Sequence, residues 1–268
     1  MAKNQIELYP TYWASFSGGK DSLYMIYYIL NHLDKYPLTG VVYFDLETDF
    51  PFIKNVVDYV ESELKRYGVP MLRIKPRKSW HEMYYHVVSS GKRVGKITGY
   101  PTRLIRWCSN QYKADSQEQL TRMMREQGKR VIYYIGFCAD EVKRFKFELN
   151  DRSNNVTQIY PLAEAGINES EILEWAKNEP IYNDYYKYND RCGCICCPMA
   201  SLKSLAYTKK YYPEEYEHYM KLALETEKMR ERELGRPFSV WASNPKYNTE
   251  YRMRRVDELI AKEEENEH

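Results

Sequence analysis

A segment near the start of the chain carries residue types that bind and polarise phosphate groups. Residues 12–22 read Tyr-Trp-Ala-Ser-Phe-Ser-Gly-Gly-Lys-Asp-Ser. Gly18 and Gly19 have no Cβ, so their backbone N–H groups can approach an anion closely. Lys20 contributes a positive charge, and Asp21 is the kind of acid that holds a metal ion such as Mg²⁺ beside phosphates. The pattern predicts nucleotide-phosphate chemistry.

The flanking residues predict that this segment joins a strand to a helix. An apolar run, Tyr12–Phe16, precedes it, and apolar residues recur at helical spacing over Asp21–Leu33. A helix N-terminus attracts phosphate through its unpaired N–H groups and its macrodipole. An ordinary Gly-Gly turn is the alternative, but turn chemistry alone does not call for Lys-Asp-Ser in that order. The candidate nucleotide-binding residues here are Ser15, Ser17, Gly18, Gly19, Lys20, Asp21 and Ser22.

The loop differs from a Walker A motif, which would place Gly at position 14 and Ser or Thr at position 21. The chain has Ala14 and Asp21 there. Ser-Gly-Gly-Lys-Asp-Ser instead resembles the signature of the PP-loop ATP pyrophosphatases. This resemblance implies cleavage of ATP between its α- and β-phosphates and attachment of AMP to a substrate.

Composition sets limits on the class of protein. The chain has 268 residues and a net charge of +2, so its total charge gives no argument for a strong polyanion field. No apolar run approaches the roughly 18 residues that span a bilayer, and the N-terminal residues lack the apolar core of a signal peptide. We therefore expect a cytoplasmic protein without a membrane partner. In that reducing compartment, six cysteines are metal ligands or catalytic groups more often than disulfides.

Strand and helix patterns alternate along the first part of the chain, which predicts an α/β fold with a parallel sheet and helices on both faces. We expect a nucleotide-binding α/β domain over 1–165 and a mostly helical region over 166–268 that carries a cysteine cluster. The expected strands are Tyr12–Phe16, Gly40–Phe44, Met71–Ile74, Val131–Gly136 and Gln158–Leu162, and the expected helices are Asp21–Leu33, Phe50–Tyr67, Ser79–Ser89 and Asn110–Gln127.

Further charged residues follow the predicted strands, where ligands of such sheets bind. Asp45 and Asp49 could take ribose hydroxyls or Mg²⁺, although capping of the next helix explains them equally well. Arg106 and Lys113 flank a helix start, where basic residues oppose the helix dipole and so favour an anion partner over a solvated surface.

In order, these segments resemble the phosphoadenosine-phosphosulfate reductase branch of the PP-loop superfamily, including its phage and DNA-phosphorothioation relatives. The resemblance covers roughly residues 12–200 and implies the adenine nucleotide alpha-hydrolase-like fold. It depends on the acidic segment with Asp45 and Asp49, on Arg106-Trp107-Cys108 with Lys113, and on Gly136 through Arg144. Two departures stand out: Leu46-Glu47 replaces Thr-Gly, and Cys138 stands where the family often has Arg.

The cysteine cluster reads Arg191-Cys-Gly-Cys-Ile-Cys-Cys-Pro198. A Cys-x-x-Cys turn is a usual half-site for Zn²⁺ or for an iron–sulfur cluster, and its spacing does not separate Zn²⁺ from a 4Fe-4S cluster. A dithiol that shuttles sulfur is the alternative. The candidate metal ligands are Cys194 and Cys197, Cys108 as a third, and Cys192 or Cys196 as a fourth.

Together these observations predict an enzyme that transfers an adenylyl group from ATP and releases pyrophosphate, with sulfur transfer to the adenylate as the following step. Lys20 would stabilise the leaving pyrophosphate, Asp21 would position Mg²⁺, and Gly136 would line the nucleotide site. Arg106, Lys113 and Arg144 would bind the oxyanion of an acceptor, either a nucleic acid or a sulfate-like ion. The resemblance also implies a sulfur-donor protein.

Two other readings stay open. The first is a sulfonucleotide reductase that acts on phosphoadenosine-phosphosulfate. Against it, the pyrophosphate-cradling loop is intact and no cysteine follows Cys197. The second is a nucleic-acid-binding module that uses a metal knuckle and some of the 27 tyrosines.

Overall fold

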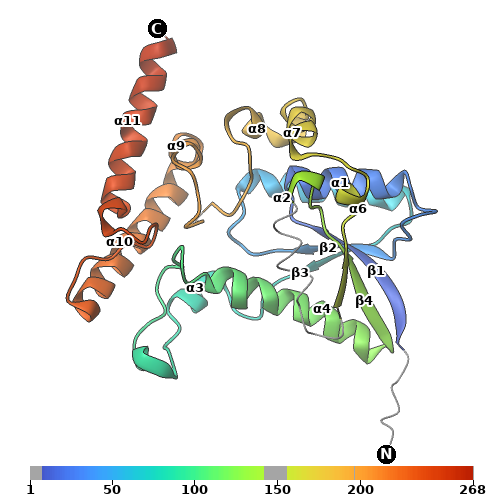
Figure 1. Cartoon of the computed structure of the whole chain (residues 1–268), viewed down its shortest axis with the longest axis horizontal. Coiled ribbons are helices and arrows are strands. Elements are labelled where there is room, and N and C mark those ends of the chain that lie inside the picture. Colours follow the sequence, from blue (N-terminus) through green and yellow to red (C-terminus); the bar gives the residue numbers. More distant parts are fainter. Residues whose placement is uncertain (1–7, 142–155, 196, 268) are drawn as a thin grey trace, which may run out of the picture. The chain divides into compact units, whose positions relative to one another are not determined.

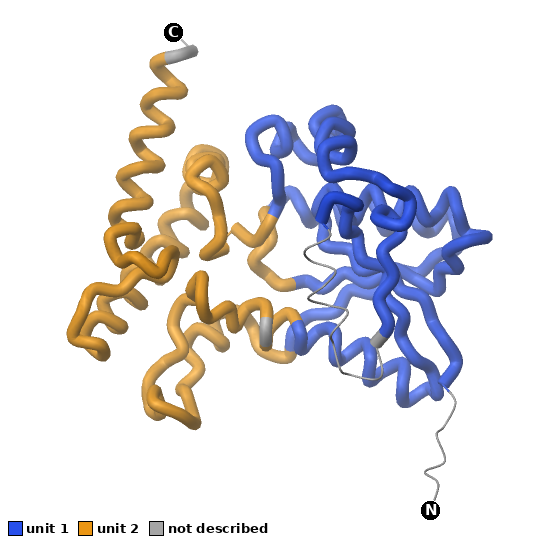
Figure 2. Tube along the Cα trace, in the orientation of Figure 1, with its two compact units in different colours: residues 1–45, 51–76, 114–192 blue, residues 46–50, 77–113, 193–268 orange. Residues whose placement is uncertain are grey.

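The computed structural model describes residues 8–141, 156–195 and 197–267, and the chain divides into two compact units (Figure 2). The first unit comprises residues 1–45, 51–76 and 114–192, and the second comprises 46–50, 77–113 and 193–268. The boundary expected near residue 165 falls inside the first unit, so these units do not coincide with the expected division. Among the described residues, no helix has the length and apolar character needed to cross a membrane.

The first unit is built on a parallel sheet of five strands, in the order β3-β2-β1-β4-β5. All five residues of β2 are buried, which suits its β-branched and aromatic side chains to a strand covered on both faces. The strands are β1 (Tyr9–Phe16), β2 (Gly40–Phe44), β3 (Met71–Ile74), β4 (Lys129–Tyr134) and β5 (Val156–Ile159).

Helices cover both faces of this sheet, which confirms the predicted α/β fold. In Figure 1, α1 (Lys20–Leu30) and α2 (Pro51–Arg66) lie on one side and α4 (Ala114–Glu126) lies on the other. Helix α2 shows why: its buried residues recur every three or four positions and form one apolar stripe. They are Phe52, Ile53, Val56, Val57, Val60 and Leu64.

Several predicted elements end earlier than expected, among them α1 at Leu30 and β4 at Tyr134, and two of these have a clear cause. Strand β5 stops at Ile159, because Pro161 has no N–H to donate and takes the first position of α6 (Pro161–Glu164). Helix α3 (Trp80–Tyr84) is short because the chain after it pairs with itself, through an antiparallel bridge between Val87 and Ile97.

The remaining helices of the first unit include α7 (Glu169–Lys177) and α8 (Tyr185–Tyr188). The second unit is mostly helical over its last segment, as expected, with α9 (Leu202–Tyr211), α10 (Pro213–Leu234) and α11 (Thr249–Glu267). Cys108–Lys113 forms a π-helix. Short 3₁₀ turns lie at Gly91–Arg93, Ala139–Glu141, Pro180–Tyr182 and Pro245–Tyr247.

Glu47 holds a backbone conformation that glycine prefers. Its φ is 62°, in the left-handed region, at the position where the similar family has Gly. The Glu47 side chain accepts hydrogen bonds from the Trp80 N–H and the Tyr112 hydroxyl, each at 3.3 Å. These contacts offset the strain of a non-glycine residue at positive φ. The turn at Glu47 thus has a left-handed backbone that two side-chain hydrogen bonds anchor.

We expect Glu47→Gly to be more stable than Glu47→Ala by about 1 kcal/mol. Both variants lose the two hydrogen bonds, but only glycine relieves the positive φ. Urea unfolding of the two proteins measures the difference. The same pair of changes at Glu217, an exposed position of α10, should show the opposite order, because glycine weakens a helix interior. Equal stability of Glu47→Gly and Glu47→Ala would contradict the strain argument.

Candidate functional site

The strand order places the loops after β1 and β4 side by side. The chain runs from β1 through β2 to β3 at one edge of the sheet and then crosses back to β4 on the other side of β1. Ligands of such sheets bind at the carboxyl ends of the strands where this reversal occurs. Gly136, just beyond β4, demonstrates the contact. A Cβ at Gly136 would lie 2.9 Å from the backbone oxygen of Asp21. Any larger residue would push the two loops apart, so the predicted nucleotide residue Gly136 does meet the glycine loop.

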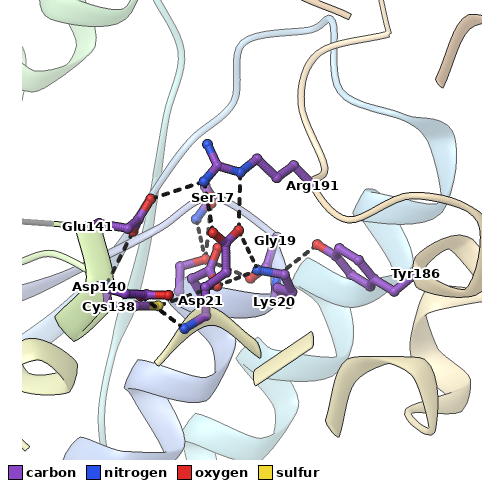
Figure 3. A network of polar contacts seen from close by, with 11 residues as sticks. Ser17, Gly19, Lys20, Asp21, Cys138, Asp140, Glu141, Tyr186 and Arg191 are labelled. Atoms are coloured by element: carbon purple, nitrogen blue, oxygen red, sulfur yellow. Dashed lines mark hydrogen bonds and ion pairs between the residues drawn. The ribbon is translucent and has the colours of Figure 1, made fainter. Parts of the chain in front are cut away.

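The loop itself has the strand-to-helix geometry that the sequence predicts. Gly18 has φ +75°, and a Cβ there would lie 2.4 Å from Cγ2 of Ile53 on α2, so glycine is required on both counts. The Ser17 N–H donates to Ser22 Oγ at 3.1 Å, and the two hydroxyl oxygens lie 3.0 Å apart. Ser22 in turn donates to the carbonyl of Gly19 at 2.9 Å. Both serines thus hold the shape of the loop. Ser17 and Gly19 are labelled in Figure 3.

Lys20 is buried at the centre of the site, with a side chain that is 1% exposed. Its Nζ lies 2.6 Å from Oδ1 of Asp21 and 3.3 Å from Oε1 of Glu169, at the start of α7. Its backbone N–H donates to the hydroxyl of Tyr186 at 2.9 Å. A buried ammonium group needs such partners, because an unpaired buried charge is strongly destabilising. The lysine is therefore fixed at both ends.

Arg191 is a second cation of the site and pairs with Glu169, the same carboxylate that contacts Lys20. Its Nε and Nη2 donate to the two carboxylate oxygens of Glu169 at 3.1 and 2.8 Å, the bidentate geometry of a guanidinium–carboxylate pair. Nη2 also lies 3.5 Å from Oε1 of Glu141. Asp140 accepts the N–H of Glu169 at 3.1 Å and so adds to the cap of α7. Three carboxylates, of Asp21, Glu141 and Glu169, thus pair with two cations, Lys20 and Arg191. Figure 3 labels the two cations with Asp21, Asp140 and Glu141.

Burial and these charges shift the pKa values of Asp21 and Glu169 in opposite directions. Burial raises the pKa of Asp21, although the neighbouring Lys20 opposes the shift. Burial also acts on Glu169, but the hydrogen bonds and charge of Arg191, with the charge of Lys20, hold its pKa below the ordinary value. Glu169 is thus stabilised as an anion, whereas Asp21 is a carboxylate that would gain from an additional cation.

Cys138 is a buried thiol in the same site. Its Sγ lies 3.8 Å from Oδ1 of Asp21, and its N–H donates to Oε2 of Glu141 at 3.2 Å. Burial, with the negative charge of Asp21 beside it, raises the pKa of the Cys138 thiol, so the group stays protonated at neutral pH. It stands where the similar family often has an arginine. The site therefore has one cation fewer on this side than the resemblance leads one to expect.

The structure brings together Ser17, Gly18, Gly19, Lys20, Asp21, Ser22 and Gly136 in one site of the first unit. Ser15 lies within β1, and Asp45, at the end of β2, pairs with Lys75 at 3.5 Å. Asp49, Arg106 and Lys113 belong to the second unit, and their roles in binding stay predictions. Arg144 lies outside the described residues.

Sequence reasoning missed Glu169, Arg191 and Tyr186. Glu169 carried a local signal only as the first residue of a capped helix, and no motif marked Arg191 or Tyr186. Glu169 and Tyr186 contact Lys20 from segments more than 140 residues away along the chain, and Arg191 pairs with Glu169.

The predicted metal ligands fall into two groups. Cys108, Cys194 and Cys197 lie in the second unit, where burial and the neighbouring Cys197 raise the pKa of Cys108 to about 11. Cys192 lies in the first unit, with its Cβ 4.0 Å from the position that a Cβ of Gly19 would take. Cys196 is outside the described residues.

No three His, Cys, Asp or Glu side chains that the structure describes are arranged to hold a metal ion. Metal binding by this cluster stays a prediction, which elemental analysis of the purified protein would check.

Comparison with known proteins gives distant relatives. No protein-family model matches the chain. Two uncharacterized proteins of Methanocaldococcus jannaschii are 24% and 27% identical to it, over 213 and 216 residues. The alignments cover 77% and 76% of this chain but 46% and 40% of the relatives, so the chain spans less than half of their length.

Two solved structures are similar to the chain. One is the U34-tRNA thiolase NcsA from Methanococcus maripaludis with its 4Fe-4S cluster, at 18% identity and a TM-score of 0.39, covering 79% of this chain and 69% of that one. The other is the phosphoadenylyl-sulfate reductase from Candida auris in a phosphate complex, at 15% identity and a TM-score of 0.40, covering 69% and 82%. The second bears the name of the family that the sequence motifs resemble. At these TM-scores we draw the function from the site and not from the two structures.

The lowered pKa of Glu169 gives a stability prediction with a definite sign. Ionised Glu169 stabilises the fold above its ordinary pKa of 4.5, and this contribution is lost as the pH falls through the lowered folded value. Glu169→Gln should therefore destabilise the chain most at pH 7, and the difference from the unmodified protein should shrink toward pH 4. Urea unfolding across this range measures it.

The matched control is Glu174→Gln on the same helix, because the side chain of Glu174 is 70% exposed. We expect this change to alter the free energy of unfolding little at either pH. A Glu169→Gln difference that stays constant from pH 7 to pH 4 would contradict the assigned ion pairs.

Proposed function

We propose that the first unit binds ATP through the Ser17–Ser22 loop and that the chain transfers the adenylyl group to an acceptor with release of pyrophosphate. One observation carries this proposal: the Ser-Gly-Gly-Lys-Asp-Ser loop lies at the reversal point of a parallel sheet, at the N-terminus of α1, with a buried lysine at its centre. Oriented amides, the positive end of a helix and an ammonium group together suit a polyphosphate.

The chemistry asked of this chain is positioning and charge stabilisation. Lys20 is already desolvated, so a phosphate that takes the place of Glu169 on Nζ gains a strong, weakly screened contact. The contact strengthens as negative charge develops on the departing pyrophosphate. Glu169 keeps its bidentate partner Arg191 after this exchange, so no carboxylate is left without a cation.

The residues present fit Mg²⁺ better than a metal bound by protein alone. Three carboxylates pair with two cations here, and Mg²⁺ commonly takes one or two carboxylates and completes its shell with phosphates and water. Asp21, whose side chain is 33% exposed and whose pKa is raised by burial, is the candidate ligand. When bound, Mg²⁺ would neutralise charge on the phosphates.

The acceptor belongs to the same proposal. An oxyanion attacks the α-phosphorus, the bond to the pyrophosphate breaks, and the pair of electrons leaves with it. Arg106, Lys113 and Arg144 are the cations that we propose for the acceptor, and a sulfur donor would then displace AMP. A sulfur-transfer enzyme of this kind agrees with the motifs that the sequence shares with the reductase branch.

The test is pyrophosphate release from ATP in the presence of candidate acceptors. Lys20→Ala and Asp21→Ala should each reduce the rate at least ~100-fold, since each removes several kcal/mol of transition-state stabilisation. Lys54→Ala, at an exposed position of α2, is the matched control and should keep the full rate. Circular dichroism would verify that all three variants fold.

Calorimetric titration separates the proposal from the reductase alternative. ATP with Mg²⁺ should bind more tightly than AMP or phosphoadenosine-phosphosulfate, by about 1–3 kcal/mol for the lost charge-assisted contacts. If the sulfonucleotide binds best and ATP hardly binds, adenylyl transfer is wrong and the reductase assignment takes its place.

A further inference from the structure

The second unit contains a pocket that the proposed ATP chemistry does not use. Its volume is about 650 Å³, within the range of small-molecule sites. Two segments far apart in the chain supply its walls, residues 86–111 and residues 226–245. Both belong to the second unit, drawn in orange in Figure 2.

The walls are fixed by hydrogen bonds between these two segments. The Arg103 N–H donates to the carbonyl of Val240 at 2.9 Å, and the Tyr100 N–H donates to Oγ1 of Thr226 at 2.8 Å. The buried carboxylate of Glu227 accepts the Val240 N–H at 3.0 Å and the Thr249 N–H at the start of α11. The pocket is therefore a preformed feature of the unit.

The lining is strongly basic. It contains four arginines, Arg93, Arg103, Arg230 and Arg236, and no acidic residue is among the described residues that line it. The whole chain, in contrast, has 40 basic and 38 acidic residues. Four guanidinium groups and no lysine favour an anion that offers two acceptor oxygens to a planar guanidinium, such as a phosphate.

The four arginines divide into two pairs. Arg93 and Arg230 share the carboxylate of Glu233, at 3.2 and 2.6 Å, and this pairing holds them in place. Arg103 and Arg236 are exposed, and neither forms an ion pair within the described part of the chain. Arg103 also lowers the pKa of Arg252, after the larger effect of burial, which is a sign of positive potential here. Arg103 and Arg236 are thus the cations available to a ligand.

Planar and apolar groups lie beside these charges. The guanidinium of Arg230 stacks over the ring of Phe238 at 5.3 Å, and the pocket is also lined by the Trp107 ring. Leu104 and Ile105 are 76% and 65% exposed on the turn that presents Arg103. Bases stack on such aromatic rings, guanidinium planes and apolar side chains. The volume also exceeds what an inorganic anion fills.

We propose that this pocket binds a nucleoside phosphate, with its phosphate on Arg103 and Arg236 and its base against Phe238, Leu104 and Ile105. The ligand is either a free nucleotide or one nucleotide of a single strand. This binding goes beyond the proposed adenylyl transfer and does not depend on it.

The test measures binding without ATP. Fluorescence anisotropy follows a labelled single-stranded oligouridylate RNA, with uridine monophosphate and inorganic phosphate as competitors. The double variant Arg103→Gln/Arg236→Gln should weaken RNA binding at least ~10-fold and lower the slope of log K against log salt by about 0.7, for the one phosphate that the two arginines hold. If uridine monophosphate displaces the labelled RNA, a free nucleotide is sufficient for binding. If only unlabelled RNA displaces it, the pocket requires a nucleotide within a strand.

The control is Arg232→Gln/Lys203→Gln, which removes the same charge from exposed positions of the second unit outside the pocket. Equal weakening by both double variants, or no binding of either RNA or uridine monophosphate, would overturn the proposal. Competition by phosphate as strong as that by uridine monophosphate would overturn the nucleoside part. Matching thermal midpoints establish that both variants fold. Failure of adenylyl transfer leaves every one of these outcomes unchanged.

Discussion

A lysine side chain that is 1% exposed must be surrounded by acceptors, because the interior of a protein does not tolerate an unpaired ammonium group. Several elements of the first unit provide the partners of Lys20. Helix α1 supplies Asp21, helix α7 supplies Glu169, and Arg191 balances the excess negative charge that the two acids bring. The closeness of the loops, which Gly136 permits, allows these groups to meet.

The elements that the sequence predicted well are those with a complete local signal. Strands β2 and β3 begin and end where their apolar runs do, and the glycine loop joins a strand to a helix as its composition indicates. Predictions were weaker where a distant contact decides the outcome. The short helix α3 gives way to a segment that pairs with itself, and the stop at Ile159 depends on whether Pro161 begins a helix or continues a strand. In both places the sequence is compatible with either outcome and does not decide between them.

The candidate site divides in the same way. Residues 17–22 could be identified because six consecutive residues carry the whole pattern. Glu169, Arg191 and Tyr186 could not, since the fold brings Glu169 and Tyr186 to Lys20, and Arg191 to Glu169, from distant segments. The sequence marked Cys138 only as a departure from the family pattern. Its contact with Asp21 results from tertiary packing and could not be predicted. A motif of neighbouring residues can be recognised in the sequence, whereas the pairing of charges from distant segments depends on the tertiary structure.

The two units are built from alternating segments of the chain, and this alternation affects how the protein folds during synthesis. The chain passes from one unit to the other after Asp45, Phe50, Pro76, Lys113 and Cys192. A nascent chain that has reached Cys192 therefore holds every segment of the first unit, but its residues 77–113 still lack α10 and Trp241 as packing partners. The ring of Trp80, buried beside Tyr219 of α10 in the folded chain, lacks this partner until α10 has been synthesised. Ribosome-bound intermediates of this length are thus the stage most open to aggregation or chaperone capture.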